Sequence, residues 1–467
     1  MQQDDEGDHA RGEPQRAPIA ALPLDVIHRP ESGAGGPAPT GTRRPRRQDR
    51  TYDAAIDAGP TAPTAPARGG PVTRFPTFEG IRALCALGIL AYHAGTFTGV
   101  TWGRDASVGG MGPWLQHLNV GVSIFFVLSG FLLFRPFVLA HLTDGVRPRF
   151  GTYLLRRLVR IYPAYWVALF ISTWLLDLNL GDWWGHLRFY ALIQVYWGDT
   201  VLGGLAQAWS LCTEVSFYLF LPLWVLLMAL RKGTVEQRIR THYLGLAVLY
   251  ATGIIVRAQL RAGGHAVGYG TLAANIDLFA IGMALAVASS AATVRGRPAG
   301  GLARTLGDLP GVAWVAAACC YAGVVALRYP FGFDPPTVFQ EVLREVLFGV
   351  IAALVVAPGV FGPQDQSVVR RVLRSRPLVA LGVVSYGIYL WHITVMVRLV
   401  RPGAFLAGAS FVSLTLWATA LTSVVAAISW FVVERPLLRR VRAGTGWGRA
   451  SVLAPEPRSD RPHVGQP

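Results

Sequence analysis

The sequence predicts an all-α membrane protein in which about ten transmembrane helices surround a polar pore. Three observations point to this fold. Of the 467 residues, 52% are hydrophobic and only 15% are charged, whereas soluble proteins carry about 25% charged residues. Apolar stretches of membrane-spanning length recur along the chain, and the mean hydropathy is +0.38. Basic residues gather in every second loop between these stretches, as they do in multi-pass membrane proteins.

The two ends of the chain differ in composition from its centre. Residues 1–72 are rich in Pro, Ala, Gly, Arg and acidic residues, so they cannot bury enough apolar surface to fold. Residues 1–77 hold ten Arg and ten acidic residues, so the formal charge of +16 belongs to the membrane part and does not indicate nucleic-acid binding. We expect a disordered tail over 1–72, a membrane domain over 73–436 and a basic, disordered tail over 437–467.

Ten apolar runs are long enough to cross a membrane. They cover residues 78–98, 117–139, 154–176, 208–230, 241–258, 271–291, 311–328, 342–361, 378–399 and 405–433. The segment 183–197 is shorter, has aromatic residues at both ends and contains His186 and Arg188. We expect this segment to lie in the membrane interface or to re-enter the membrane without crossing it.

The charges of the loops set the predicted orientation. The loops after the second, fourth, sixth and eighth spans are rich in arginine, and the intervening loops are poor in basic residues. Because basic loops stay on the cytoplasmic side, both termini of this multi-pass protein are predicted to be cytoplasmic and the protein is expected in the cell membrane. A full crossing by residues 183–197 would move every later basic loop to the outer face.

The first span contains two ionisable residues, Arg82 and His93, eleven positions apart. At about 100° per residue, eleven residues return to nearly the same face of a helix, about 16 Å further along. Such groups are costly to bury in hydrocarbon, so we expect both to face one polar cavity that forms a functional site. A structural pair capped by neighbouring groups is the alternative.

Other spans carry polar groups that could complete this site. Arg157 and Arg160 are one helical turn apart and could bind phosphates, or they could simply mark a cytoplasmic loop. Glu214 enters the membrane from the outer side near the depth of His93, so its carboxylate could fix the His93 tautomer in general-base chemistry. Local capping or pairing of Glu214 is the alternative.

Further candidates are weaker because each has a simple structural explanation. His392 is a rival to His93 as the base, although aromatic belts such as the one around Tyr389 are common near membrane interfaces. Ser129 is one of the small residues that let helices pack closely, and as a nucleophile it would need a base in reach. Asn275 and Asp277 could line the same cavity. The four cysteines show no metal-ligand spacing, so we expect no metal site.

Taken together, seven segments in this order resemble the acyltransferase-three family, whose members are integral-membrane enzymes. They are FEGIRALCALGILAYH, FFVLSGFLL, the Arg157 and Arg160 pair followed by IYPAYW, WSLCTEVSFYL, NIDLFAIGMALA, SYGIYLWH and the closing ERP at 434–436. The resemblance covers residues 75–436. Glu79 stands where the family usually has Asp, and Val215 and Ser216 stand where it usually has Glu and Gln, which puts a second acid there in doubt.

The resemblance implies an enzyme that moves an acyl group from cytosolic acyl-CoA to a hydroxyl of a glycan, glycolipid or secondary metabolite, with no other cofactor. It implies His93 as the catalytic base, Arg82 as its partner in the pore and Glu214 as a polar wall. Arg157 and Arg160 would lie on the donor side, and Ser129, Trp209, Tyr389 and His392 are further predicted substrate-binding residues. The chain ends soon after the last span, so we expect the stand-alone form without a C-terminal hydrolase-like domain.

A transporter or flippase for a glycan or lipid is the competing hypothesis. In that case Arg82, His93 and Glu214 would form a proton or substrate path through the membrane. No internal repeat and no pair of matched broken helices is visible in the sequence, and these features are typical of many transporters. The acyl group and the acceptor are not specified by the sequence.

Overall fold

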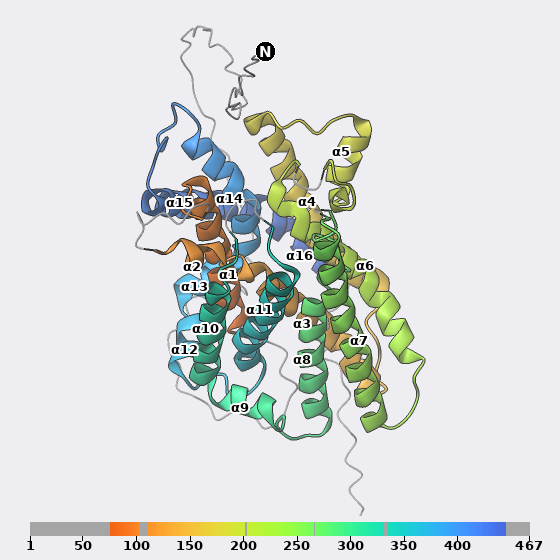
Figure 1. The fold of residues 1–467 in the computed structure, drawn as a ribbon. Coiled ribbons are helices and arrows are strands. Elements are labelled where there is room, and N and C mark those ends of the chain that lie inside the picture. Colours follow the sequence, from red (N-terminus) through yellow and green to blue (C-terminus); the bar gives the residue numbers. More distant parts are fainter. Residues whose placement is uncertain (1–74, 102–109, 201–202, 266, 331–334, 445–467) are drawn as a thin grey trace, which may run out of the picture. The chain divides into compact units, whose positions relative to one another are not determined.

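The computed structural model describes residues 75–101, 110–200, 203–265, 267–330 and 335–444. The predicted N-terminal tail over 1–72 and residues 445–467 of the predicted C-terminal tail lie outside these ranges. The regular elements of the described part are all helical (Figure 1). They are α1 Phe78–Phe97, α2 Gly112–Gln116, α3 Val120–Leu142, α4 Phe150–Leu176, α5 Trp183–Tyr190, α6 Trp209–Ala229, α7 Val235–Ala262, α8 Ile276–Val294, α9 Leu302–Asp308, α10 Pro310–Ala326, α11 Val338–Val360, α12 Val368–Leu373, α13 Arg376–Val383, α14 Ser385–Val400, α15 Phe411–Ser429 and α16 Arg435–Gly444.

The helices confirm the predicted all-α membrane fold. Within the described residues, eight helical stretches are long and apolar enough to cross a membrane, and the number rises to ten if two bent helix pairs are each counted as one span. The bent pairs are α9 with α10, which meet at 104°, and α13 with α14, which meet at 71°. Each of the ten predicted runs therefore corresponds to one helix or bent pair of the bundle.

The segment 183–197 does not form a spanning helix. Its helix α5 has only 8 residues and is followed by a 3₁₀ turn at Gln194–Tyr196. Eight helical residues reach about 12 Å, far less than the roughly 30 Å of a bilayer core. Side chains of α4 bind the carbonyl groups at the end of α5: Tyr165 donates to the oxygen of residue 189 at 2.8 Å and Tyr162 to that of residue 191 at 2.9 Å. These bonds fix the segment against α4.

Helix α3 packs most closely against α8, because glycines allow the two backbones to touch. A Cβ atom added to Gly130 would lie 2.4 Å from the carbonyl oxygen of Phe279, and one added to Gly282 would lie 2.0 Å from that of Val127. Small residues at a helix crossing permit this close approach in membrane proteins. The crossing fixes α3 in the interior of the bundle, where its Ser129 can face α6.

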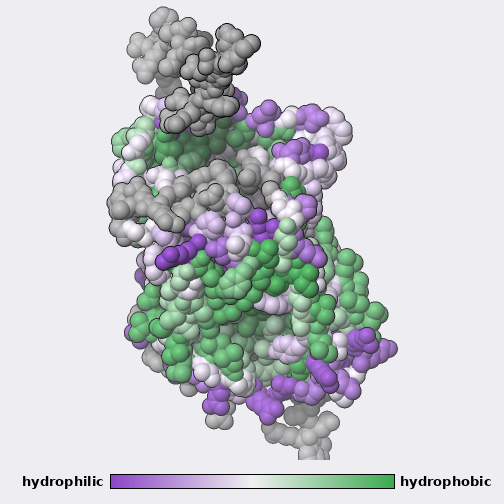
Figure 2. Space-filling view, viewed as in Figure 1, coloured by the Kyte–Doolittle hydropathy of each residue, from purple (hydrophilic) through white to green (hydrophobic). Residues whose placement is uncertain are grey.

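The outer surface of the bundle is apolar, as expected for a protein surrounded by lipid. Helix α6 shows this clearly: Leu219, Leu223, Leu226 and Leu230 are exposed, and their spacing of four, three and four residues places them on one face. The space-filling view shows hydrophobic surface over much of the bundle, with hydrophilic residues gathered at the lower right edge (Figure 2). The opposite face of α6 carries Glu214 and points inward.

The last helix extends beyond the predicted end of the membrane domain. A π-helical turn at Trp430–Glu434 joins α15 to α16, which continues as helix to Gly444. Residues 437–444, which were expected to belong to a disordered tail, are therefore helical here. The turn also places Glu434 inside the bundle, where its side chain is buried, and such π-helical turns are often found at functional sites.

Candidate active site

A cavity of about 100 Å³ lies between α1, α3, α4, α6 and α14. It brings together six residues that the sequence analysis proposed from five different segments. These are Arg82, Ser129, Arg157, Arg160, Glu214 and Tyr389. The remaining predicted residues, His93, His392 and Trp209, are not among the lining residues of this cavity.

Three arginines give this first cavity a positive end. Arg82 donates from Nε to Ser385 Oγ at 3.2 Å and lies 3.8 Å from a carboxylate oxygen of Glu79. Arg157 and Arg160 form no ion pair within 4.0 Å among the residues that the structure describes. Guanidinium groups without a bound carboxylate are well suited to hold phosphate or another planar anion.

Glu214 forms hydrogen bonds that differ from those expected. Its Oε1 accepts from Ser129 Oγ at 2.8 Å and from the hydroxyl of Tyr218, one turn further along α6, at 2.7 Å. From the sequence, this carboxylate could have fixed the tautomer of His93. That contact is not formed: the imidazole of His93 instead contacts Ile89 and His392. Glu214 therefore lines the cavity and accepts hydrogen bonds from Ser129 and Tyr218.

His93 and His392 form a hydrogen-bonded pair whose protonation follows from their partners. His392 Nδ1 lies 2.7 Å from the carbonyl oxygen of Tyr389, which can only accept, so Nδ1 carries the proton and Nε2 keeps its lone pair. His93 Nδ1 lies 3.0 Å from that Nε2 and 3.0 Å from the carbonyl oxygen of Ile89. Both neighbours are acceptors, so this assignment leaves Nε2 of His93 unprotonated and able to accept a proton. His392, which was predicted as a rival base, is thus a hydrogen-bond partner of His93.

Tyr389 connects the histidine pair to the first cavity. Its hydroxyl donates to the carbonyl oxygen of Gln207 at 2.7 Å and lies 2.6 Å from Ser210 Oγ, while its carbonyl holds His392. One residue of α14 thus forms part of the cavity wall and also orients the histidines. Ser210 bonds to these groups and has no histidine among its hydrogen-bond partners in the described chain.

A second cavity, of about 460 Å³, lies where α7 ends and where α3, α8 and α11 begin. Val122 and Phe126 of α3 line both cavities, so these two side chains form a common wall. Trp209, a predicted substrate-binding residue, lines the second cavity rather than the first. Asn275 also lines the second cavity, although the sequence indicated that it and Asp277 could line the cavity of His93. Asp277 is buried and lines neither of the two cavities.

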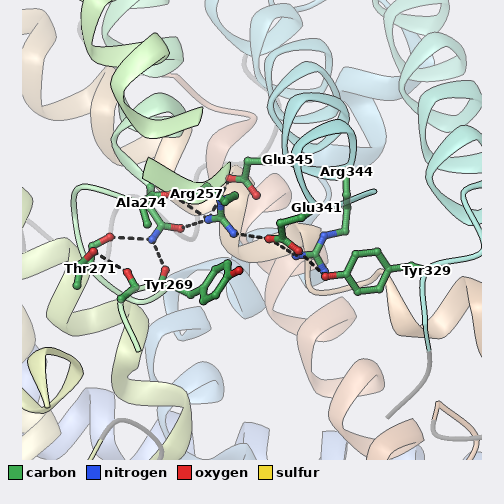
Figure 3. Close-up of polar contacts among 10 residues, drawn as sticks. Arg257, Tyr269, Thr271, Ala274, Tyr329, Glu341, Arg344 and Glu345 are labelled. Carbon is green, nitrogen blue, oxygen red and sulfur yellow. Dashed lines mark hydrogen bonds and ion pairs between the residues drawn. The ribbon is translucent and has the colours of Figure 1, made fainter. Parts of the chain in front are cut away.

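The second cavity contains an ion-pair cluster that the sequence analysis did not propose (Figure 3). Arg257 pairs with Glu341 at 3.0 Å and with Glu345 at 3.4 Å, and Arg344 pairs with Glu341 at 3.0 Å. Charged residues within apolar helices indicate a polar site, and this was the reason for selecting Arg82 from the sequence. Tyr218 and Ser385 were also missed, and they carry no signal of this kind because hydroxyl side chains are common in spanning helices.

No metal site is evident in the described ranges. Among them, no group of three or more His, Cys, Asp or Glu residues is arranged to hold a metal ion. The polar side chains described above are guanidinium, carboxylate, amide and hydroxyl groups in the two cavities and imidazole groups in the histidine pair.

Comparison with known proteins places these features in a family. The profile of the acyltransferase domain matches residues 75–434. The chain is 26% identical over 383 residues to a Bacillus subtilis (strain 168) protein named "Putative peptidoglycan O-acetyltransferase YrhL". The aligned region covers 78% of this chain and 54% of that protein. It is 24% identical over 391 residues to the peptidoglycan O-acetyltransferase OatA of Listeria monocytogenes serovar 1/2a, covering 78% of this chain and 55% of the relative.

The chain spans about half the length of these curated relatives. No solved structure matches it significantly. The profile match nevertheless covers most of the chain and includes both cavities and the histidine pair. The chain therefore belongs to the acyltransferase domain family.

Proposed function

We propose that this chain is a membrane O-acyltransferase that moves an acyl group from acyl-CoA to a hydroxyl group of a glycan, glycolipid or secondary metabolite. The observation that carries the proposal is the first cavity. At one end it has Arg157 and Arg160, which form no ion pair in the described chain, and through Tyr389 it is joined to a histidine with a free lone pair. The names of the relatives support an acetyl group and a cell-wall glycan as acceptor.

Arg157 and Arg160 are proposed to bind the phosphates of the donor. They lie in the first half of α4 and have no carboxylate partner within ion-pair distance in the described chain, so an incoming anion does not have to displace one. Arg82 follows along the cavity. It lies about 16 Å before His93 on the helix, too far for direct contact with groups that react at His93. Its proposed role is therefore to guide the donor.

His93 is proposed to act as the general base. Its Nε2 takes the proton of the acceptor hydroxyl while the hydroxyl oxygen attacks the thioester carbonyl. When the tetrahedral intermediate collapses, the carbon–sulfur bond breaks and the CoA thiolate takes up that proton. His392 Nε2 accepts the Nδ1–H of His93 throughout, so it stabilises the imidazolium that forms. A general base of this kind typically contributes about 10² to 10⁴-fold to the rate.

The arrangement in the membrane is proposed from the loop charges. The arginine end of the first cavity would face the cytoplasm, where acyl-CoA is made, and both termini would be cytoplasmic. The second cavity lies at the start of α3, the end of α7 and the start of α11. In the proposed orientation these helix ends face away from the cytoplasm. Donor and acceptor would then approach the histidine pair from opposite sides of the membrane.

The test uses the full chain purified in detergent, with radiolabelled acetyl-CoA as donor and chitotetraose, an uncharged N-acetylglucosamine tetramer, as acceptor. His93→Ala should reduce kcat by about 10² to 10⁴-fold and leave the Kd for acetyl-CoA nearly unchanged. The control is His186→Ala, a histidine of α5 that lines neither cavity. If purified His93→Ala kept more than about a tenth of wild-type transfer, the base assignment would be wrong.

The proposed binding of the donor phosphates by Arg157 and Arg160 is tested separately with the same assay. Arg160→Lys should raise the KM for acetyl-CoA more than the KM for the acceptor, because the compact lysine charge replaces a planar guanidinium poorly. Arg240→Lys, an exposed residue of α7, is the matched control. Equal effects of Arg160→Lys on both substrates would contradict the assignment. If acetyl-CoA were neither bound nor consumed, and the glycan instead moved between compartments in proteoliposomes, the transporter hypothesis would replace the enzyme.

A further inference from the structure

We propose that the second cavity binds a polyhydroxylated sugar ring of the acceptor, an inference that rests on the proposed acyl-transfer function. The cavity of about 460 Å³ falls within the range of about 300 to 1,000 Å³ that small-molecule sites occupy. It combines fixed polar groups, which suit the hydroxyl groups of a sugar, with several aromatic rings, which suit the C–H face of the sugar ring. Four observations carry the argument: position, charge, aromatic lining and local order.

The position of the second cavity fits an acceptor. Only Val122 and Phe126, one turn apart on α3, are shared between its lining and that of the first cavity. A ligand in the second cavity therefore lies across one wall from a donor in the first.

Four of the five charged residues that line the second cavity are paired with one another, unlike Arg157 and Arg160 of the first; the fifth, Arg261, forms no ion pair among the described residues. Arg257 donates to Glu341 Oε1 at 3.0 Å, to Asn275 Oδ1 at 2.9 Å and to the carbonyl oxygen of Ala274 at 3.0 Å. Arg344 donates to both carboxylate oxygens of Glu341, at 3.0 and 3.1 Å. A strongly anionic ligand would have to disrupt these pairs in order to bind Arg257 or Arg344. Hydroxyl groups both donate and accept, so they can use the remaining N–H groups and lone pairs without breaking them.

Aromatic side chains supply the flat apolar surface that the C–H face of a sugar ring requires. Trp209, Tyr269, Tyr329 and Phe348 all line the cavity. The guanidinium carbon of Arg257 lies 5.7 Å from the ring centre of Tyr269, and that of Arg344 lies 4.1 Å from the ring centre of Tyr329, so cation–π contacts help to orient both rings. The hydroxyl of Tyr269 is protonated at neutral pH, because the ordinary pKa of tyrosine is about 10 and burial raises it further, so this group can act as a donor.

The start of α11 fixes the carboxylates of the cluster. Thr337 and Gln340 form a capping box in which Gln340 N donates to Thr337 Oγ1 at 3.1 Å and Thr337 N donates to Gln340 Oε1 at 2.9 Å. Glu341 and Glu345 follow, one turn apart, and therefore face the same side of the helix. Asn275 is held in turn by the carbonyl oxygens of two loop residues, as Figure 3 shows. The polar groups are thus ordered before any ligand binds.

The test measures sugar binding separately from donor binding. Full-length protein in nanodiscs is titrated with chitotetraose and, in parallel, with acetyl-CoA by isothermal titration calorimetry. Tyr269→Ala removes a lining ring that lies in a loop, and Glu345→Gln removes a charge at nearly constant shape. Each should weaken chitotetraose binding about tenfold or more, while the Kd for acetyl-CoA stays within about twofold. Tyr243→Ala is the matched control, because Tyr243 is exposed on α7 and lines neither cavity.

The outcomes separate this inference from the proposed function. If wild-type protein does not bind chitotetraose, or if Tyr269→Ala and Glu345→Gln bind it as wild type does, the inference is overturned and the cluster only joins α7, α8 and α11. If acetyl-CoA is still bound and consumed in that case, the proposed function stands. If the sugar binds in a Tyr269-dependent manner but acetyl-CoA is neither bound nor consumed, the acyltransferase proposal fails, and the acceptor role fails with it.

Discussion

The contact between His93 and His392 allows a test of how the proposed base is held. His392 is 1% exposed, and its Nε2 lies 3.0 Å from His93 Nδ1. His392→Leu replaces the ring with an apolar side chain of similar size, so it removes the acceptor without leaving a large void. The carbonyl oxygen of Ile89, also 3.0 Å from His93 Nδ1, remains as a second acceptor. The loss should therefore be partial.

The size of the loss follows from this geometry. The Nδ1–H of the His93 imidazolium would lose one of the two acceptors that share it, and a hydrogen bond to a charged group contributes about 1.5 to 3 kcal/mol. At about 1.4 kcal/mol per factor of ten, kcat should fall about 10 to 150-fold. His93→Ala removes the base itself and should cost about 10² to 10⁴-fold. His392→Gln keeps an acceptor near the position of Nε2 and should recover most of the activity.

The assay is a double-mutant cycle on kcat with acetyl-CoA at saturation. Because His392 acts through His93, adding His392→Leu to His93→Ala should reduce the residual rate by less than about twofold. Circular dichroism melting curves check that each variant is folded. Two results would refute the reasoning: additive losses in the double variant, or a larger loss for His392→Leu than for His93→Ala. The second result would make His392 the base.

Two further predictions concern the fold and its orientation. Gly282→Ala places a Cβ atom 2.0 Å from a main-chain oxygen of α3, so it should destabilise the protein by about 1 to 3 kcal/mol and lower its Tm. The control is Gly323→Ala, whose added Cβ atom meets nothing within 4 Å. Equal melting temperatures of the two variants would show that the α3–α8 contact is looser than described. Lys232 is exposed and follows α6. In Lys232→Cys, the new thiol should react with a membrane-impermeant reagent after lysis but not in intact cells. Labelling in intact cells would show that the predicted orientation is wrong.

Much of the fold and part of the site could be predicted from the sequence, because a membrane makes both hydrophobicity and charge informative. Runs of apolar residues long enough to span a bilayer predicted the helices, and the short segment 183–197 was recognised as non-spanning. Arg82, Arg157 and Arg160 were recognised because a charge in an apolar span is costly unless it faces a polar interior. The structure places all three around one cavity. The same signal would have revealed Arg257, Arg344 and Glu345, had it been applied to the predicted spans 241–258 and 342–361.

Pairings between helices could not be predicted in this way. His93 and His392 are 299 positions apart, yet they share a hydrogen bond. Glu214 was expected beside His93 and instead binds Ser129, 85 positions earlier in the chain. Periodicity gives the face on which a side chain lies, but not the helix that this face meets.

By itself, the sequence determined the helical class, the spans and the positions at which polar groups enter the membrane, because these depend on local hydrophobicity and on the period of the α-helix. Only the tertiary structure decided that the two cavities described above share a wall and that His392 is the partner of His93. These features depend on how closely the helices approach one another. That distance is set by backbone contacts such as the one at Gly282 between α3 and α8, which no single helix contains.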